Sequence, residues 1–206
     1  MRSLPNILTV IRILLTPVFV YCLLSDSLQI FAALIFLFAS VTDWYDGYLA
    51  RKYGYTSAWG KFLDPLADKV LVLSAFFSLV YLGVVKLWMV MVIMLRDFLV
   101  TTLRSYTMSH GKPMMTNLFA KFKTVSQMIM IGVILIFVSL QSGLTTWHTD
   151  YRDHINTTVT VINEYNVIYA GMLCVTMLTA ASGIVYLYQN RESLRHLTMF
   201  SFFKNS

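Results

Sequence analysis

Two neighbouring stretches decide how this chain folds: residues 40–51 read SVTDWYDGYLAR, and residues 60–69 read GKFLDPLADK. Between them they contain four aspartates, and apolar runs long enough to enter a lipid bilayer flank both stretches. The aspartates are Asp43, Asp46, Asp64 and Asp68. An aspartate at the centre of a membrane helix costs about 2.5–3.5 kcal/mol on insertion scales. Positively charged partners must therefore compensate these carboxylates.

The spacing of the aspartates indicates what those partners are. Asp43 and Asp46 are three residues apart, and the second pair is separated by four. In a helix, both spacings place the two carboxylates of a pair on one face. Two helices joined by a short turn would present four carboxylates to one cleft, where two divalent cations would balance the charge. Oxygen-only ligands favour Mg²⁺, Mn²⁺ or Ca²⁺ over Zn²⁺. In the alternative, purely structural interpretation, the aspartates pair with nearby basic residues, namely Arg51, Lys52, Lys61 and Lys69.

The composition is that of an integral membrane protein. Hydrophobic residues make up 57% of the chain and charged residues 13%, and the mean hydropathy is +0.66. We expect an all-α protein with six transmembrane helices in a bundle, forming one domain over residues 1–206. The six apolar segments cover residues 6–25, 28–50, 61–83, 86–109, 118–141 and 164–189. In such a protein the net charge of +6 reflects cytoplasmic loops and anionic lipid headgroups, and no nucleic-acid partner is expected.

The distribution of basic residues predicts the orientation in the membrane. With the amino terminus inside, thirteen of the 16 Lys and Arg residues lie at or near the cytoplasmic side. These are Arg2, Arg12, Arg51, Lys52, Lys61, Lys69, Arg104, Lys112, Lys121, Lys123, Arg191, Arg195 and Lys204. Lys86 and Arg152 fall outside, and Arg96 lies within a span. We therefore expect a multi-pass protein of the cytoplasmic (inner) membrane, with the four aspartates at the cytoplasmic ends of the second and third helices.

The two stretches together resemble the signature of the CDP-alcohol phosphotransferase family. The pattern is Asp-x2-Asp-Gly-x2-Ala-Arg-x8-Gly-x3-Asp-x3-Asp, and the resemblance extends over nearly the whole chain. All eight fixed positions match: Asp43, Asp46, Gly47, Ala50, Arg51, Gly60, Asp64 and Asp68. The resemblance implies transfer of a phosphatidyl group from the substrate CDP-diacylglycerol to an alcohol, with release of CMP. It also implies two divalent cations, Mg²⁺ or Mn²⁺, and a homodimer.

The resemblance also implies a role for each of these residues. Asp43, Asp46 and Asp64 are implied metal ligands, and Asp68 is implied to be both a ligand and the general base for the acceptor hydroxyl. The residues implied to contact the CDP group are Gly47, Ala50, Arg51 and Gly60. Glycine and alanine leave room for the nucleotide, and an arginine can pair with a phosphate.

Two further elements bear on the acceptor alcohol. In the first segment Asn6, Thr9 and Arg12 recur every three residues and share a helix face. The start of the fifth segment, residues 117–128, reads NLFAKFKTVSQM. Both elements resemble the branch of the family whose acceptor is glycerol 3-phosphate, although Ala120 stands where that branch usually has glycine. The expected phosphate-binding residues are Asn6, Thr9, Arg12, Arg104, Lys121 and Lys123.

Other interpretations stay open at this point. Asn6 and Thr9 can serve as a helix cap and a backbone-bonding hydroxyl, and the lysines can anchor a helix end at the membrane surface. The acceptor can be that of a cardiolipin, phosphatidylinositol-phosphate or phosphatidylserine synthase, because these enzymes share the aspartate motif. A divalent-cation transporter would also place acids in membrane helices, but it would need matching acids on the outer half of the membrane.

The roles of three further features are left open by the sequence. Arg96 and Asp97 are adjacent on the fourth segment and point about 100° apart, so we expect each to meet a partner on another helix. Residues 142–163 are polar and are expected to form a solvated external loop. Cys22 and Cys174 both lie in apolar segments and are expected to be reduced and packed.

Overall fold

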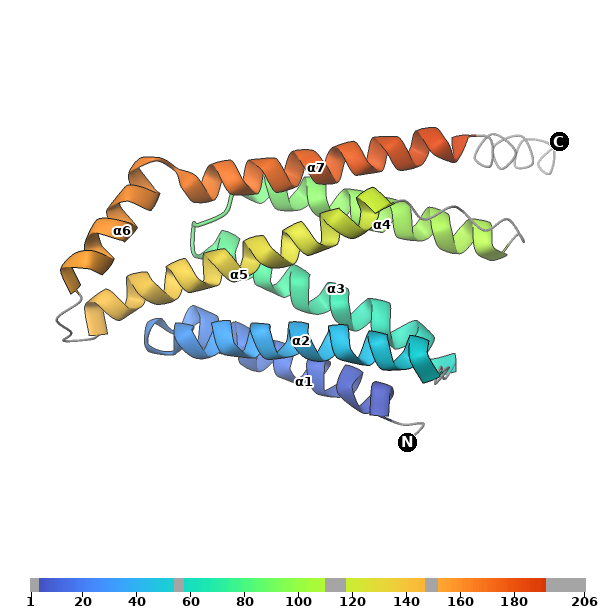
Figure 1. Cartoon of the computed structure of the whole chain (residues 1–206), viewed down its shortest axis with the longest axis horizontal. Coiled ribbons are helices and arrows are strands. Elements are labelled where there is room, and N and C mark those ends of the chain that lie inside the picture. Colours follow the sequence, from blue (N-terminus) through green and yellow to red (C-terminus); the bar gives the residue numbers. More distant parts are fainter. Residues whose placement is uncertain (1–3, 54–57, 110–117, 147–151, 192–206) are drawn as a thin grey trace. The chain divides into compact units, whose positions relative to one another are not determined.

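The computed structural model of the protein describes residues 4–53, 58–109, 118–146 and 152–191, and all regular elements in these ranges are helices (Figure 1). For residues 4–9, 43–53, 58–68, 105–109, 118–121, 144–146 and 152–154 it describes the helical backbone only. The elements are α1 (Leu4–Leu24), η1 (Asp26–Leu28), α2 (Gln29–Tyr53), α3 (Ala58–Tyr81), α4 (Leu87–Ser109), α5 (Leu118–Thr146), α6 (Arg152–Glu164) and α7 (Val167–Gln189).

Each of the six predicted apolar segments lies on a helix, which confirms the all-α class. Among the described residues, Phe122–Gly143 and Val167–Gln189 are long and apolar enough to cross a membrane. Val10–Leu24 and Asp26–Thr42, which are bent by 116° at a short break, would provide a third span if they cross as one. The number of six spans and their arrangement in a bundle stay predictions.

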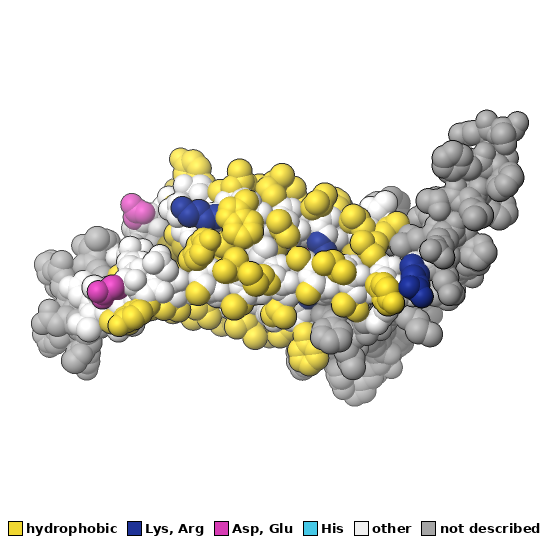
Figure 2. Space-filling model, turned by 90° about the horizontal axis from the view of Figure 1, so that it is seen from above, with side chains coloured by type: hydrophobic (Ala, Val, Ile, Leu, Met, Phe, Trp, Pro, Cys, Tyr) yellow, Lys and Arg dark blue, Asp and Glu magenta, His cyan; other side chains and the backbone are white. Residues whose placement is uncertain are grey.

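The described surface is largely apolar. Large hydrophobic side chains are exposed on every long helix, among them Leu14 on α1, Leu37 on α2, Leu95 on α4 and Ile184 on α7. Hydrophobic side chains cover most of the face seen in Figure 2. Such a surface has a favourable environment in the hydrocarbon of a bilayer and not in water.

The predicted loop at residues 142–163 was wrong in part. Helix α5 continues to Thr146, and residues Arg152–Glu164 form the helix α6. In α6, Val159 is buried while Ile155 and Ile162 are partly covered, at spacings of four and three residues. This short apolar face stabilises a helix within an otherwise polar stretch, and the other described side chains of α6 are exposed. The segment ends at Asn166, whose φ of 49° is one that asparagine tolerates at a helix terminus.

The helices fall into two compact units, each of which combines separate parts of the chain. The first unit contains α1, α2, α3, the part of α5 from Met128 onward, and α6. The second unit contains α4, the part of α5 up to Gln127, and most of α7. Whether residues 1–206 behave as a single domain stays a prediction.

In the first unit, α1 packs against both α2 and α3 (Figure 1). Phe19 of α1 and Phe36 of α2 are buried, with their ring centroids 5.9 Å apart. Helix α3 contributes the fully buried Phe76. It ends in a Schellman motif, in which Gly83 takes a φ of 74° and the amide of Val84 donates to the carbonyl of Leu79 at 3.0 Å.

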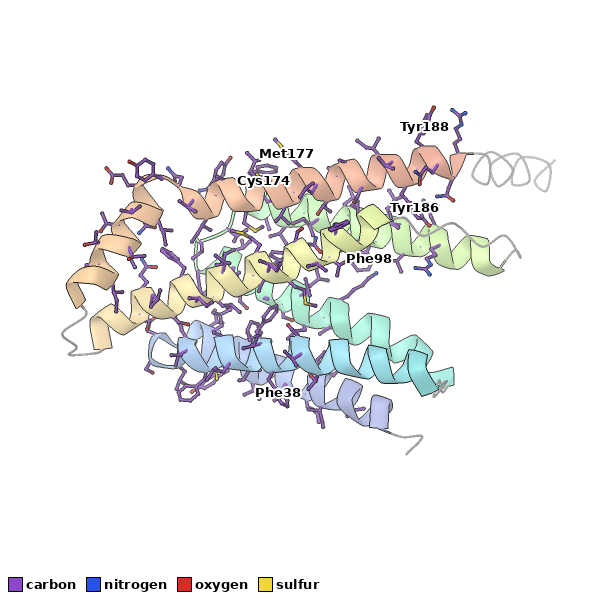
Figure 3. All side chains as sticks on the ribbon, in the orientation of Figure 1. Phe38, Phe98, Cys174, Met177, Tyr186 and Tyr188 are labelled. Atoms are coloured by element: carbon purple, nitrogen blue, oxygen red, sulfur yellow. The ribbon has the colours of Figure 1, made fainter. Side chains whose placement is uncertain are left out.

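The second unit has a core of unbranched and branched aliphatic side chains. Met89, Val90 and Ile93 of α4 are buried, as are Met172 and Val175 of α7. The two cysteines of the chain differ in environment: Cys22 of α1 is buried as expected, but Cys174 of α7 is exposed, which corrects the expectation that it would be packed (Figure 3). Position 174 lies one residue before the buried Val175, and adjacent residues on a helix point about 100° apart.

Candidate functional site

The aspartate motif lies on two helices of the first unit. Asp43 and Asp46 fall within α2, and Asp64 and Asp68 fall within α3. Both segments are continuous helix, so the register that places each pair on one face is present. Helix α1 packs against both of these helices, so α2 and α3 share one neighbour. The side chains of these four residues, and of Gly47, Ala50, Arg51 and Gly60, lie outside the described residues.

The donor set of the motif suits hard divalent cations. Four carboxylates on two helices supply oxygen ligands alone, and Mg²⁺ and Mn²⁺ prefer such ligands. Two cations would offset four negative charges that would otherwise be costly in an apolar bundle. The residues that would hold the metals are Asp43, Asp46, Asp64 and Asp68.

Arg12 is a buried cation on α1, the helix that contacts both motif helices. Its side chain is 2% exposed, and the hydroxyl of Thr16 donates to its carbonyl at 2.9 Å. A charged side chain buried in this way among apolar helices is a functional candidate. Thr9 and Asn6 lie on the same helix, about one and two turns earlier, but their side chains lie outside the described residues.

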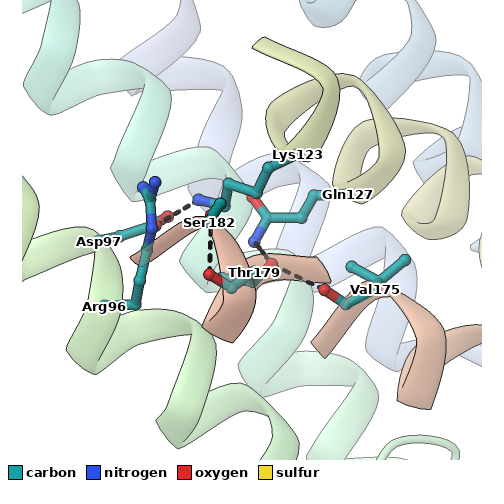
Figure 4. A network of polar contacts seen from close by, with 7 residues as sticks. All are labelled: Arg96, Asp97, Lys123, Gln127, Val175, Thr179 and Ser182. Carbon is teal, nitrogen blue, oxygen red and sulfur yellow. Dashed lines mark hydrogen bonds and ion pairs between the residues drawn. The ribbon is translucent and has the colours of Figure 1, made fainter. Parts of the chain in front are cut away.

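A second group of charges lies in the second unit. The ammonium group of Lys123 on α5 contacts Asp97 Oδ1 on α4, and Nη1 of Arg96 donates to the same oxygen at 3.3 Å (Figure 4). The expectation that Asp97 meets a partner on another helix is confirmed. Direct pairing of Arg96 with Asp97 was not expected, but the long arginine side chain reaches its neighbour.

The position of Arg96 depends on a glycine of α7. A Cβ atom at Gly183 would lie 2.9 Å from Cγ of Arg96, closer than real Cβ contacts allow. The absence of a side chain at position 183 therefore lets the arginine lie directly against α7. Tyr186, one turn further along α7, is also buried (Figure 3).

Neutral hydrogen bonds join α5 and α7 beside these charges (Figure 4). Gln127 Nε2 donates to Thr179 Oγ1 at 3.4 Å. The Thr179 hydroxyl donates to the carbonyl of Val175 at 2.7 Å, and the Ser182 hydroxyl donates to the carbonyl of Thr179 at 2.7 Å. The bonds made by Thr179 and Ser182 satisfy hydroxyl groups inside an apolar helix, while the Gln127 bond crosses to a second helix.

The sequence reasoning singled out none of the α7 residues in this cluster. A signal was present, since Thr179, Ser182 and Gly183 are small residues in an otherwise apolar helix. Small and hydroxylated residues in membrane helices mark faces where helices approach closely. Of the predicted phosphate ligands, Arg104 is exposed on α4 and Lys123 is buried on α5. The side chain of Lys121 lies outside the described residues.

Comparison with known proteins identifies the family. The sequence profile of CDP-alcohol phosphatidyltransferases matches residues 2–163, which include the whole aspartate motif. The chain belongs to the CDP-alcohol phosphatidyltransferase family. It is therefore an enzyme, a transferase, and with its long apolar helices it is an integral membrane protein.

Curated members of the family align over most of their own length. A Bacillus subtilis protein is 39% identical over 150 residues, covering 66% of this chain and 78% of the relative. A Rickettsia typhi protein is 38% identical over 146 residues, covering 70% and 82%. A Haemophilus influenzae protein is 37% identical over 139 residues, covering 65% and 75%. All three are named CDP-diacylglycerol--glycerol-3-phosphate 3-phosphatidyltransferase.

Proposed function

We propose that this phosphatidyltransferase transfers the phosphatidyl group of CDP-diacylglycerol to sn-glycerol 3-phosphate, giving phosphatidylglycerophosphate and CMP. The observation that carries the proposal is the complete eight-residue motif, with its aspartates in helical register on α2 and α3, in a chain whose relatives bear that activity in their names. Phosphatidylglycerophosphate is a phospholipid precursor, so the reaction belongs to phospholipid biosynthesis.

In the proposed mechanism the four aspartates have two roles, metal binding and proton acceptance. Asp43, Asp46 and Asp64 would hold the two divalent cations, and Asp68 would add a further ligand oxygen. When bound, the cations offset the negative charge of the pyrophosphate and of the departing CMP. Asp68 accepts the proton of the acceptor hydroxyl as its oxygen bonds to the phosphatidyl phosphorus. The bond from that phosphorus to the oxygen of CMP breaks, and the electron pair leaves with CMP.

The remaining predicted residues bind and orient the two substrates. Gly47, Ala50 and Gly60 leave space for the nucleotide, and Arg51 pairs with one of its phosphates. Arg12, Arg104, Lys121 and Lys123 supply positive charge for the phosphate of glycerol 3-phosphate. Asn6 and Thr9 add neutral donors on the face of α1 that carries Arg12.

An apolar groove in the first unit suits the acyl chains of the lipid substrate. The groove has a volume of about 490 Å³ and lies between α2 and α5, with Ile30 and Ser40 as the first and last α2 residues that line it. Ser40 precedes the first motif aspartate by three residues on the same helix. An acyl chain in this groove would run along α2 toward the nucleotide site.

The proposal extends to the setting of the enzyme. We place it in the cytoplasmic (inner) membrane with six spans, with its amino terminus and active site on the cytoplasmic side, and as a homodimer. The excess of basic residues on that side supports the orientation. Other acceptors within the family form the second candidate, because the aspartate motif does not distinguish among alcohols. A divalent-cation transporter is a more remote alternative, and membership of a transferase family argues against it.

The test is CMP release by the purified protein with CDP-diacylglycerol and one acceptor at a time. We expect release with glycerol 3-phosphate, and not with inositol phosphate, serine or phosphatidylglycerol. Chelation should abolish the release, and Mg²⁺ or Mn²⁺ should restore it. Release with a different acceptor alone would reassign the enzyme within its family, and no release with any alcohol would contradict the proposal.

A further inference from the structure

Three charged side chains converge inside the second unit, where α4, α5 and α7 meet. Lys123 contacts Asp97, with side chains that are 5% and 25% exposed. Arg96, whose side chain is 12% exposed, contacts the same carboxylate oxygen at 3.3 Å. Two cations thus share one carboxylate (Figure 4).

This arrangement is poorly explained by stability alone. Buried ion pairs are often no more stabilising than apolar residues of the same volume, because desolvation offsets the attraction between the charges. In addition, Nε and Nη2 of Arg96 are buried and have no hydrogen-bond partner among the described residues. Ionisable groups retained inside a membrane helix bundle at such a cost indicate function.

The surrounding contacts hold the carboxylate of Asp97 in one place. Gly183 allows Arg96 to lie against α7, so the arginine approaches Asp97 from one direction. Lys123 approaches it from α5. One turn further along α5, Gln127 bonds to Thr179 of α7, which fixes the position of α5 beside the pair.

We propose that Asp97 is a positioning residue for the acceptor, which fixes the ammonium group of Lys123 where the phosphate of glycerol 3-phosphate binds. The inference rests on the proposed function, in which Lys123 contacts that phosphate. Lysine is a compact charge on a flexible stem with three donors. The contact with Asp97 already restricts the Lys123 side chain, so less conformational entropy is lost when phosphate binds.

The test compares Asp97→Asn with the wild type in detergent, measuring CMP release while each substrate is varied in turn. We expect the KM for glycerol 3-phosphate to rise about tenfold, as for the loss of one charge-assisted hydrogen bond. The KM for CDP-diacylglycerol should stay unchanged. Thr176→Val is the matched control, because it removes a buried hydroxyl that bonds within α7, to the carbonyl of Met172, and takes no part in the cluster. It should lower thermal stability and leave both KM values as they are.

A second comparison keeps the inference testable if Asp97→Asn does not fold. Lys123→Gln is compared with the double variant Asp97→Asn/Lys123→Gln, which contains no lysine for Asp97 to position. If Asp97 acts through Lys123, the two variants have the same KM for glycerol 3-phosphate. A higher KM in the double variant would overturn the inference, as would an unchanged KM in folded Asp97→Asn. Wild-type protein that releases no CMP with glycerol 3-phosphate would instead contradict the proposed function, before any variant is compared.

Discussion

The Asp68→Asn substitution replaces the carboxylate, which can accept a proton, by an amide, which cannot. We predict that Asp68→Asn lowers kcat for CMP release by a factor of about 10²–10⁴, the usual contribution of a general base. The protein should fold normally, because the two side chains have the same shape. Asp26→Asn is the matched control, since Asp26 is an exposed aspartate on η1 outside the motif. Comparable losses in both variants would contradict the role of Asp68.

Gly183 allows a prediction about packing at a single residue. In Gly183→Ala the new methyl group would lie 2.9 Å from Cγ of Arg96, and overpacking of this kind costs about 1–3 kcal/mol. Gly132→Ala on α5 is the control, because no atom lies within 4 Å of a Cβ at that position. It should be neutral or stabilise by up to about 1 kcal/mol, since alanine is the better helix former. The measurement is thermal unfolding in detergent, and equal shifts in both variants would show that Arg96 does not constrain position 183.

At the scale of the helix, α2 has one phenylalanine buried against α1 and another that is exposed. Phe36 is 3% exposed and stacks near Phe19, whereas Phe38 is 58% exposed (Figure 3). We predict that Phe36→Ala destabilises the protein by about 3–5 kcal/mol, as expected for a large side chain removed from a core. Phe38→Ala should leave thermal unfolding in detergent nearly unchanged. If the two variants unfold together, the packing of α1 on α2 is not as described.

The helices themselves could be predicted from the sequence, because each long apolar segment is helical in a membrane. The short helix α6 could not, since its apolar face consists of three residues in a polar stretch. The eight-residue motif indicated a candidate active site, because the spacing of its acids places each pair on one face when the segment is helical. The pair Asp97–Lys123 joins residues 26 positions apart on different helices, and no local pattern shows which helices pack together. The direct contact of Arg96 with Asp97 was missed because helix geometry describes directions at Cβ and not the reach of a long side chain.

At the scale of the whole molecule, the distribution of charge should fix the orientation in the membrane. Thirteen of 16 basic residues fall on one side when the amino terminus is placed inside. CDP-diacylglycerol and glycerol 3-phosphate are both charged at the reacting end, so the motif aspartates must lie where water-soluble substrate can reach them. The proposed reaction and the orientation are therefore linked, because the side that carries the aspartates must be the side that supplies glycerol 3-phosphate.

Cysteine labelling in intact cells tests this orientation. In a variant that lacks Cys22 and Cys174, one cysteine is introduced between α2 and α3 as Ser57→Cys, or between α5 and α6 as Thr149→Cys. We predict that a membrane-impermeant maleimide labels the Thr149→Cys protein in intact cells. The Ser57→Cys protein should react only after the membrane is permeabilised, because the proposed topology assigns its linker to the cytoplasmic side together with Arg51, Lys52 and Lys61. The reverse pattern would place the aspartate motif outside the cell, away from cytoplasmic glycerol 3-phosphate. That result would contradict both the proposed topology and the assignment of glycerol 3-phosphate as the acceptor.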